Sequence, residues 1–217
     1  MNLIPHSYNQ IAGLSIRRIE ALSDGVFAIA MTLLILDIHV PVKEAFASET
    51  ELFTAFLGLT PKFLNYLMSF MTLGIFWTGH SAQFSFIDRS DRHLNWISLF
   101  FLLFVSVLPF TTAFLNSHPE FRVSIALYWL NIFSLGVLLY VHWAYAERHE
   151  YISSKNHSLV SISLAIRKRI VVAQTLYAVG ALLCFISNYL SIGFIVLVQM
   201  NYALALFSGK HLKRVSS

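Results

Sequence analysis

The sequence predicts an all-α integral membrane protein with six transmembrane helices in a single domain, 1–217. Only 12% of its 217 residues are charged and 57% are hydrophobic, whereas a soluble domain carries about 25% charged residues. The hydrophobic residues gather in long runs, and an α-helix needs roughly 20 such residues to cross a bilayer. We therefore expect membrane spans at about 18–40, 61–84, 94–115, 121–146, 169–187 and 190–208.

The first span combines an apolar run with acidic residues at both of its ends. The run extends from Gly25 to Leu36 and lies between Asp24 and Asp37. An ionisable residue at membrane depth costs roughly 2.5–3.5 kcal/mol on insertion scales, so such residues normally face protein or water. This helix is therefore expected inside an assembly, where one of its faces is a candidate lining for a permeation pathway.

Proline residues mark the second and third spans. Thr60 and Pro61 fit the start of a new helix, with Thr60 as its N-cap and Pro61 in its first turn. A single helix from about Glu49 that kinks at Pro61 fits the same residues equally well. Pro109 lies inside the third span, where it leaves a backbone carbonyl that a neighbouring group must satisfy.

The distribution of Lys and Arg predicts the orientation of the chain. Twelve of the 15 basic residues fall on the side that also holds both termini, and the polar stretch 147–166 is interpreted as the longest loop there. Cytoplasmic loops carry an excess of Lys and Arg, so we expect both termini in the cytoplasm and the protein in the plasma membrane. The twelve residues are Arg17, Arg18, Arg89, Arg92, Arg148, Lys155, Arg167, Lys168, Arg169, Lys210, Lys213 and Arg214. The other three are Lys43, Lys62 and Arg122.

Four residues of the first span form one stripe about 100° wide on the helix, at spacings 0, 3, 4 and 7. They are Ile29, Thr32, Leu33 and Leu36. Asp24 lies roughly 140° from Ile29 on the same helical wheel, so the acids and the stripe occupy different sides. Most apolar stripes are ordinary helix-packing surfaces. As a pore lining, however, this one would form apolar rings that block ions by excluding water.

The polar residues at the start of the first span fit two interpretations. Arg18 with Ser23 or Asp24 fits the capped start of a cytoplasmic helix. Alternatively, Ser23 and Asp24 form a buried polar network with Trp77 and His80, which lie on one face at the end of the second span. A Trp indole can only donate a hydrogen bond, whereas a His ring can donate or accept one. His80 considered alone fits an interfacial histidine.

The chain lacks the motifs of the common enzyme classes and of the best-known channel filter. It has no TVGYG-type filter, phosphate-binding glycine loop, HExxH or G-x-S-x-G motif, and its nine histidines follow no metal-ligand spacing. Its one cysteine, Cys184, excludes a disulfide framework and a cysteine-based metal site. The basic residues are spread over the ends of the spans, which argues against a nucleic-acid partner. We therefore expect no catalytic set, no metal site and no cofactor.

The segment Arg18-Ile-Glu-Ala-Leu22-Ser23-Asp24 resembles the RxxxFSD signature on the first span of the transmembrane protein 175 potassium channels. Leu22 stands where the signature has Phe. Both side chains are apolar, so we expect Leu22 to preserve the packing that Phe provides at this position.

The resemblance extends to the next two spans and covers most of the chain. It includes Trp77-x-x-His80 and the third span from Asn95 to Pro109-Phe110, together with the six-span layout and its cytoplasmic termini. We therefore expect a structural and gating network that consists of Arg18, Ser23, Asp24, Trp77, His80 and Asn95.

The same resemblance implies a homotetramer in the lipid bilayer, with four first helices around a central pore. By this resemblance, Ile29 occupies the position of the pore constriction in the family, and Leu33 and Leu36 occupy the positions of its further apolar layers. Thr32 occupies the position of the threonine that is tied to potassium preference. These are the four residues that the helical wheel places on one face.

Together these inferences predict a potassium-selective or potassium-preferring channel that passes K⁺ passively. The main alternative is a proton-coupled transporter with Asp24 and His80 as its relay, for which the inverted repeats and broken helices of such proteins would be expected. Neither feature is evident. A membrane enzyme or scaffold is a third class, disfavoured by the lack of a catalytic set.

Overall fold

The computed structural model describes residues 15–40, 47–153 and 159–204, and the regular structure of these residues is helical. The end of the predicted sixth span, 205–208, lies outside the described residues, as do Lys43, Lys155, Lys210, Lys213 and Arg214. The elements in chain order are α2 (Ile16–Leu33), the 3₁₀ helix η1 (Leu34–Asp37), α3 (Glu49–Gly58), α4 (Thr60–Phe84), α5 (Arg92–Ser117), α6 (Arg122–Arg148), α7 (Leu159–Leu182), the 3₁₀ helix η3 (Leu183–Phe185) and α8 (Asn188–Leu204).

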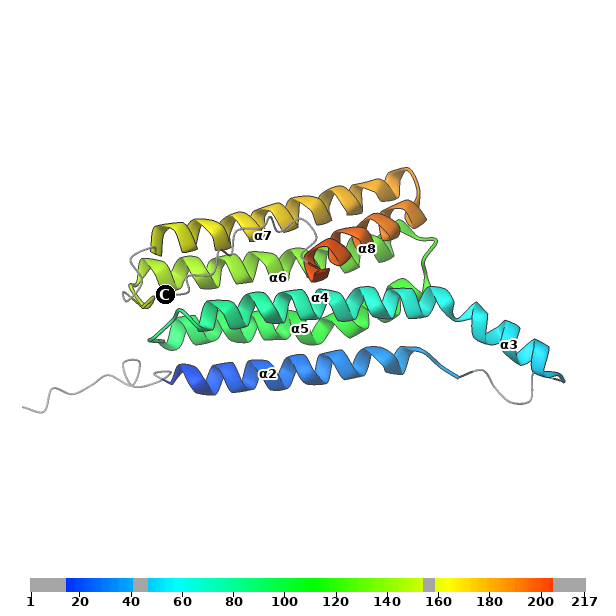
Figure 1. The fold of residues 1–217 in the computed structure, drawn as a ribbon, viewed down its shortest axis with the longest axis horizontal. Coiled ribbons are helices and arrows are strands. Elements are labelled where there is room, and N and C mark those ends of the chain that lie inside the picture. The colour runs from blue at the N-terminus through cyan, green and yellow to red at the C-terminus, as the bar shows by residue number, and fades with distance from the viewer. Residues whose placement is uncertain (1–14, 41–46, 154–158, 205–217) are drawn as a thin grey trace, which may run out of the picture.

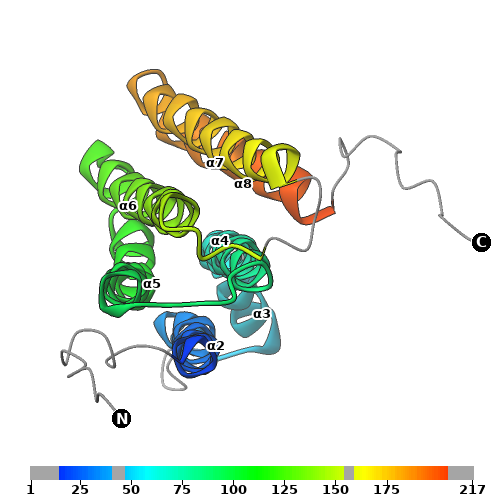
Figure 2. The same cartoon turned by 90° about the vertical axis from the view of Figure 1, so that its left-hand side faces the viewer.

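The helices form one elongated bundle. In Figure 1, α2, α4, α5, α6 and α7 run side by side along the long axis, and α3 extends from one end of α4. Viewed along the helices in Figure 2, α2 lies at one edge of the bundle, where it contacts both α4 and α5. Helix α6 packs against α5, and α7 and α8 lie on the side away from α2. One face of α2 is therefore left uncovered by the described helices.

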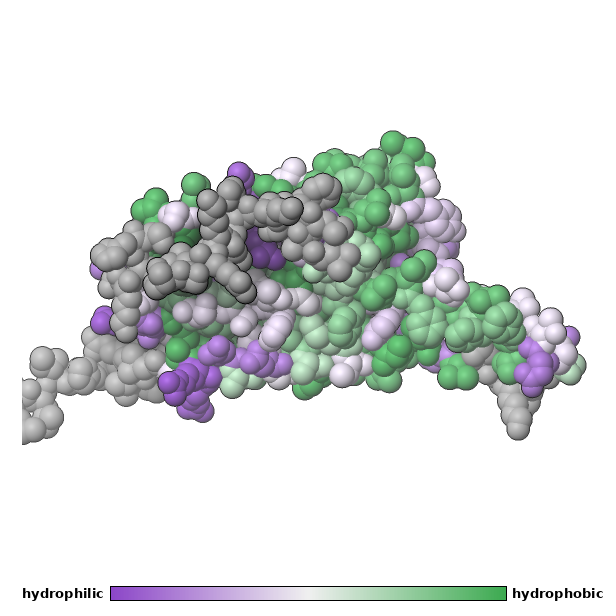
Figure 3. Space-filling view, viewed as in Figure 1, coloured by the Kyte–Doolittle hydropathy of each residue, from purple (hydrophilic) through white to green (hydrophobic). Residues whose placement is uncertain are grey.

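Four helical segments of the described chain are long and apolar enough to cross a membrane: Ile16–Asp37, Arg92–Ser117, Arg122–Arg148 and Leu159–Phe185. Figure 3 accordingly shows a largely hydrophobic surface over the middle of the bundle, with hydrophilic residues near the start of α2 and at α3. The all-helical membrane class is thus confirmed, while the count of six spans stays a prediction.

Helix α4 falls outside that group of four although it lies in the middle of the bundle. Five of its polar side chains are buried, and they lower the hydropathy of the helix without being exposed on its surface. They are Asn65, Ser69, Thr72, His80 and Gln83. The described part of α8 is 17 residues long, slightly shorter than a typical span.

Within the described part of the chain, side chains cap the starts of α3 and α5. The Asp91 carboxylate accepts a hydrogen bond from the amide of Leu94 (2.8 Å) at the start of α5, and the Ser48 hydroxyl accepts one from the Glu51 amide (3.2 Å) at the start of α3. The first alternative for Pro61 is confirmed, because α3 and α4 are separate helices. The predicted N-cap is wrong, however: the Thr60 hydroxyl donates instead to the Leu57 carbonyl (2.6 Å) in the preceding turn.

The stretch 147–166 is not all loop, because α7 begins at Leu159, well before the expected start of the fifth span at 169. Polar residues of this first part of α7 are satisfied by α6. The indole of Trp143 donates to the Ser163 hydroxyl (3.1 Å), and Arg167 forms a salt bridge with Glu147. The segment Leu159–Ile166 reads LVSISLAI and is mostly apolar, so the expectation of one continuous polar stretch up to residue 166 was wrong.

Pro109 lies inside α5, as predicted, and a side chain from α6 satisfies the backbone beside it. In the orientation that satisfies both amide atoms, Asn131 donates to the Phe104 carbonyl (3.1 Å) and accepts from the Leu108 amide (3.2 Å). Asn131 is buried, with 4% of its surface exposed. Pro109 itself removes the amide donor of the Val105 carbonyl, four residues earlier, so Asn131 braces the turn of α5 just before the proline and does not replace the bond that is lost there.

The basic residues of the described chain gather toward one end of the bundle. Helix α2 begins at this end, α4 and α6 finish there, and α5 and α7 begin there (Figure 1). The residues near this end are Arg17, Arg18, Arg89, Arg92, Arg148, Arg167, Lys168 and Arg169, while Lys62 and Arg122 stand at the starts of α4 and α6 at the other end.

Candidate functional site

The predicted stripe of α2 faces away from the bundle. Ile29, Leu33 and Leu36 are 61%, 44% and 67% exposed, and Thr32 is also exposed. The opposite face is buried, with Phe27 only 1% exposed against the ring of Phe101. Helix α2 therefore anchors one side in its own chain and presents the stripe as an uncovered apolar surface.

Thr32 is the one hydroxyl on this stripe. Its hydroxyl donates to the Ile29 carbonyl of its own helix (2.8 Å), so the hydroxyl hydrogen is already bonded within α2. The oxygen lone pairs then remain on an exposed surface, where they can accept from water or coordinate a cation.

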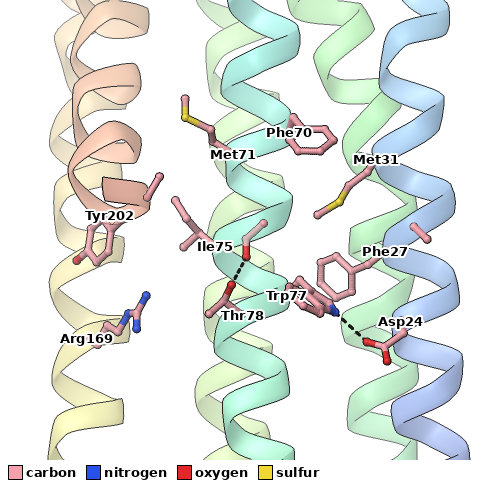
Figure 4. A pocket seen from close by; sticks show the side chains of 13 residues that line it. Asp24, Phe27, Met31, Phe70, Met71, Ile75, Trp77, Thr78, Arg169 and Tyr202 are labelled. Atoms are coloured by element: carbon pink, nitrogen blue, oxygen red, sulfur yellow. Dashed lines mark hydrogen bonds between the residues drawn. The ribbon is translucent and has the colours of Figure 1, made fainter. Parts of the chain in front are cut away.

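Two side-chain hydrogen bonds join the beginning of α2 to the end of α4. The Ser23 hydroxyl lies 3.0 Å from Nδ1 of His80, and both residues are buried. The indole Nε1 of Trp77 donates to Oδ1 of Asp24 (2.8 Å), at a more exposed position (Figure 4). The predicted contacts of Ser23 and Asp24 with the second span are therefore present, which favours the network over simple helix capping. Asp24 and His80 bind different partners rather than each other.

His80 also belongs to a buried cluster that sequence analysis missed. Its ring lies 5.1 Å from the ring of His142 on α6, measured between centroids. Nδ1 of His142 lies 2.7 Å from Oε1 of Gln83, and Nε2 of Gln83 donates to the Leu139 carbonyl (3.0 Å). The Nε2 atoms of both histidines are buried without a hydrogen-bond partner among the described residues. Gln83 lies one turn after His80, which was a usable signal, whereas nothing in the spacing of His142 indicated this contact.

Arg18 and Asn95, the other predicted members of the network, have different surroundings. The Arg18 side chain is exposed, and its guanidinium forms no hydrogen bond or ion pair with another described residue. Oδ1 of Asn95 accepts a hydrogen bond from the Ser90 hydroxyl (2.6 Å), which ties it to the loop before α5.

The loop before α5 holds a second polar group, centred on Asp91. Its Oδ2 accepts from the Tyr145 hydroxyl (2.7 Å) and lies 3.5 Å from Nδ1 of His93. Burial works against the charged form, but the hydrogen bonds from the Leu94 amide and Tyr145 outweigh it and lower the pKa of Asp91 below its ordinary value. This carboxylate therefore joins α5 to the end of α6 in its ionised form.

A family model described as the endosomal/lysosomal potassium channel TMEM175 matches residues 18–109, which cover most of α2, all of α3 and α4, and α5 as far as Pro109. A potassium channel of Chamaesiphon minutus is 33% identical over 190 residues, which cover 86% of this chain and 93% of that protein. The human endosomal/lysosomal proton channel TMEM175 is 31% identical over 210 residues, which cover 86% of this chain but 39% of the human protein.

A solved structure has the same fold. The crystal structure of a lysosomal potassium-selective channel TMEM175 homolog from Chamaesiphon minutus aligns with a TM-score of 0.74 at 33% identity, covering 88% of this chain and 97% of the other. This structural similarity and the sequence match over nearly the full length of the bacterial relative together establish the family of the protein. The chain belongs to the TMEM175 family.

Proposed function

We propose that this protein is a potassium-selective or potassium-preferring channel that passes K⁺ passively, without an enzymatic step, a metal or another cofactor. The bacterial relatives and the solved structure are named as potassium channels. The observation in this chain that carries the proposal is the uncovered stripe of α2, because its opposite face is already packed against α4 and α5. Four copies with this stripe toward a common axis form the proposed pore.

The gate in this proposal is apolar. Rings of Ile29, Leu33 and Leu36 exclude water from a narrow pore, and an ion cannot enter a dry constriction. Between them, four Thr32 hydroxyl oxygens face the axis with their hydrogens already donated to the backbone. Such oxygens can partly replace the hydration shell of a cation, which is why we assign ion preference to Thr32.

The polar contacts at the start of α2 set the position of the pore helix in this proposal. Ser23 and Asp24 hold α2 on the same turn of α4 through His80 and Trp77. Any shift of α2 that opens the pore must stretch these bonds, so they belong to the gating network. Arg18 and Asn95 are assigned to the same network from the resemblance alone.

The proposed assembly is a homotetramer of six-span subunits in the plasma membrane, with both termini cytoplasmic and no nucleic-acid partner. Eight described basic residues lie toward the bundle end where α2 begins, against two at the other. This asymmetry supports the orientation through the positive-inside rule. The buried polar side chains of α4 support its inclusion as a span despite its lower hydropathy.

Proton permeation is the second candidate, because the vertebrate relatives are named proton channels. The chain covers 31% of the mouse protein and 39% of the human one. We therefore do not assign the proton-channel activity of the whole vertebrate protein to this chain. A proton-coupled transporter that uses Asp24 and His80 is less well supported, since no hydrogen bond links these two side chains directly.

Flux through the purified protein in liposomes tests the proposal. With equal pH on both sides, a potassium gradient alone should drive current, and replacing K⁺ by Na⁺ on one side should shift the reversal potential toward that of K⁺. A pH-sensitive dye inside the same liposomes reports proton entry separately. Potassium movement that requires a proton gradient would make the protein a transporter, and proton entry without potassium current would favour the second candidate.

A further inference from the structure

Asp37, the acid at the far end of the apolar run of α2, is tied to two other helices. Its Oδ2 accepts a hydrogen bond from Nδ2 of Asn116 near the end of α5 (2.5 Å), and Oδ1 of Asn116 accepts one from Nδ2 of Asn65 on α4 (2.7 Å). An ionised carboxylate can only accept, so Asn116 must turn its NH₂ group toward Asp37 and its oxygen toward Asn65. The three side chains therefore form one directional chain of hydrogen bonds from η1 through α5 to α4.

The 3₁₀ turn η1 directs Asp37 toward these partners. Residues three apart lie on the same side of a 3₁₀ helix, and Leu34, three residues before Asp37, is only 2% exposed. Asp37 therefore lies on the side of η1 that packs against α4 and α5, whereas Leu36 is 67% exposed. Because Asn65 is 6% exposed, the chain of hydrogen bonds ends in the interior of the bundle.

This chain of hydrogen bonds lies at the opposite end of the apolar run from the contacts of Ser23 and Asp24. Thirteen residues separate Asp24 from Asp37, about 20 Å at a rise of 1.5 Å per residue. The side chains between them are apolar except for that of Thr32, which donates only to its own helix. The apolar segment is thus held by polar contacts at each end, and Leu36 directly adjoins the outer one.

From this geometry we infer that Asn116 and Asn65 are positioning residues for the outer end of the pore helix. They act through Asp37, because the chain of hydrogen bonds fixes η1 on α4 and α5 and so sets the position of Leu36. The inference rests on the proposed function, in which Leu36 forms the last apolar ring of the pore. That ring is held independently of Ile29, which lies nearer the contacts of Ser23 and Asp24.

The reactivity of a cysteine at the last ring tests this role. Leu36→Cys in a Cys184→Ala background is recorded in a bilayer while an impermeant, charged thiol reagent is added on the side where α5 ends, and the rate of the change in current is measured. Asn116→Ala should raise this rate about tenfold or more, since it removes a hydrogen bond to a charged group. Ile29→Cys, with the reagent added from the opposite side, should react at an unchanged rate.

Asn131→Ala is the matched control. It also removes hydrogen bonds between an asparagine and α5, but these lie outside the chain that holds η1. It should therefore leave the modification rate of Leu36→Cys unchanged, although it lowers the stability of the protein.

An exchange of the two partners provides a rescue. Asn116→Asp alone sets two carboxylates against each other and should raise the modification rate as Asn116→Ala does. In the double variant Asp37→Asn, Asn116→Asp, the new amide at position 37 can donate to the new carboxylate at position 116, which can still accept from Asn65. The double variant should therefore restore the slow rate.

Three results would overturn the inference while leaving the proposed channel intact. They are an unchanged rate in Asn116→Ala, an equal increase in Asn131→Ala, and a double variant as reactive as Asn116→Asp. If the mass of the protein shows that Leu36→Cys is modified while the current does not change, the pore assignment itself fails, and the inference fails with it.

Discussion

Ser23 and Asp24 are adjacent on α2, yet their side chains meet α4 in different environments. Ser23 is 3% exposed and faces His80 in the interior, whereas Asp24 is exposed and binds Trp77 at the surface. Because Trp77 and His80 lie one turn apart on α4, two neighbouring residues fasten α2 to a single turn of its partner. The buried bond should contribute more to stability, since loss of one partner leaves the other without hydrogen bonds or water.

We expect Ser23→Ala to lower the free energy of unfolding by about 1–3 kcal/mol, because it leaves Nδ1 of His80 buried and unpaired. Chemical denaturation in detergent measures this change. Ser85→Ala is the control, since the Ser85 hydroxyl is exposed and only donates to the Ala82 carbonyl. Equal stability of the two variants would show that the Ser23–His80 contact is energetically unimportant.

Asp91 predicts a pH dependence of stability. Its pKa is lower in the folded protein than its ordinary value of 3.8, so the ionised form stabilises the fold. That stabilisation is present above the ordinary pKa and is lost as the pH falls through the folded pKa. Asn is itself a good N-cap, so Asp91→Asn keeps the start of α5, while it removes the charge and the oxygen that accepts from Tyr145. The wild type should be the more stable protein at pH 7, and the difference in unfolding midpoint should shrink below about pH 4. A difference that stays constant between pH 7 and pH 3 would contradict this assignment.

At the scale of the helix, α2 was predicted well because its two faces are encoded locally. The spacing of Ile29, Thr32 and Leu33 identified the uncovered side, and the position of Ser23 and Asp24 identified the side that binds α4. The contact between His80 and His142 could not be predicted, because it depends on how α4 and α6 pack. The contact of Asn131 with the backbone just before Pro109 has the same origin, because it depends on how α5 and α6 pack.

The start of α7 shows a second limit of sequence analysis. The segment from Leu159 to Ile166 is mostly apolar, but the basic run from Arg167 to Arg169 that follows it was interpreted as the end of a loop. The hydropathy of α4 is low for another reason, because several of its polar side chains are buried against neighbouring helices. Polarity in a membrane protein thus marks where a helix finds partners as well as where the chain leaves the bilayer.

The hydrogen bonds of Asn131 to α5 yield a prediction at this scale. Asn131→Ala should destabilise the protein by about 1–3 kcal/mol, because the Phe104 carbonyl and the Leu108 amide lose their partner next to Pro109. Ser134→Ala provides the comparison on the same helix, since the Ser134 hydroxyl donates only to the Leu130 carbonyl one turn back. Unfolding midpoints that fall equally in both variants would argue against a role of Asn131 in bracing α5.

For the whole molecule, the asymmetric charge distribution predicts the orientation in the membrane. Single cysteines at Asp88, after α4, and Ser117, at the end of α5, lie at opposite ends of the bundle. In a Cys184→Ala background, an impermeant thiol reagent added outside intact cells should label Ser117→Cys and spare Asp88→Cys until the membrane is opened. Labelling of both from outside would refute the proposed topology.

The uncovered stripe, the buried opposite face and the family relationship make α2 the proposed pore helix, and three substitutions on α2 separate its faces. Ile29→Asn places a polar side chain at the tightest ring and should wet it, raising basal potassium current. Thr32→Ala should lower the ratio of K⁺ to Na⁺ permeability, while the channel still conducts. Phe27→Leu, on the buried face against Phe101, should alter stability and leave ion preference unchanged.

Bilayer recording of Ile29→Asn and Phe27→Leu beside the wild type, under opposed potassium and sodium gradients, tests the pore assignment most directly. The account predicts a larger basal current in Ile29→Asn and a wild-type reversal potential in Phe27→Leu. An Ile29→Asn channel that conducts no better than the wild type, together with a shifted reversal potential in Phe27→Leu, would place the pore on the other face of α2.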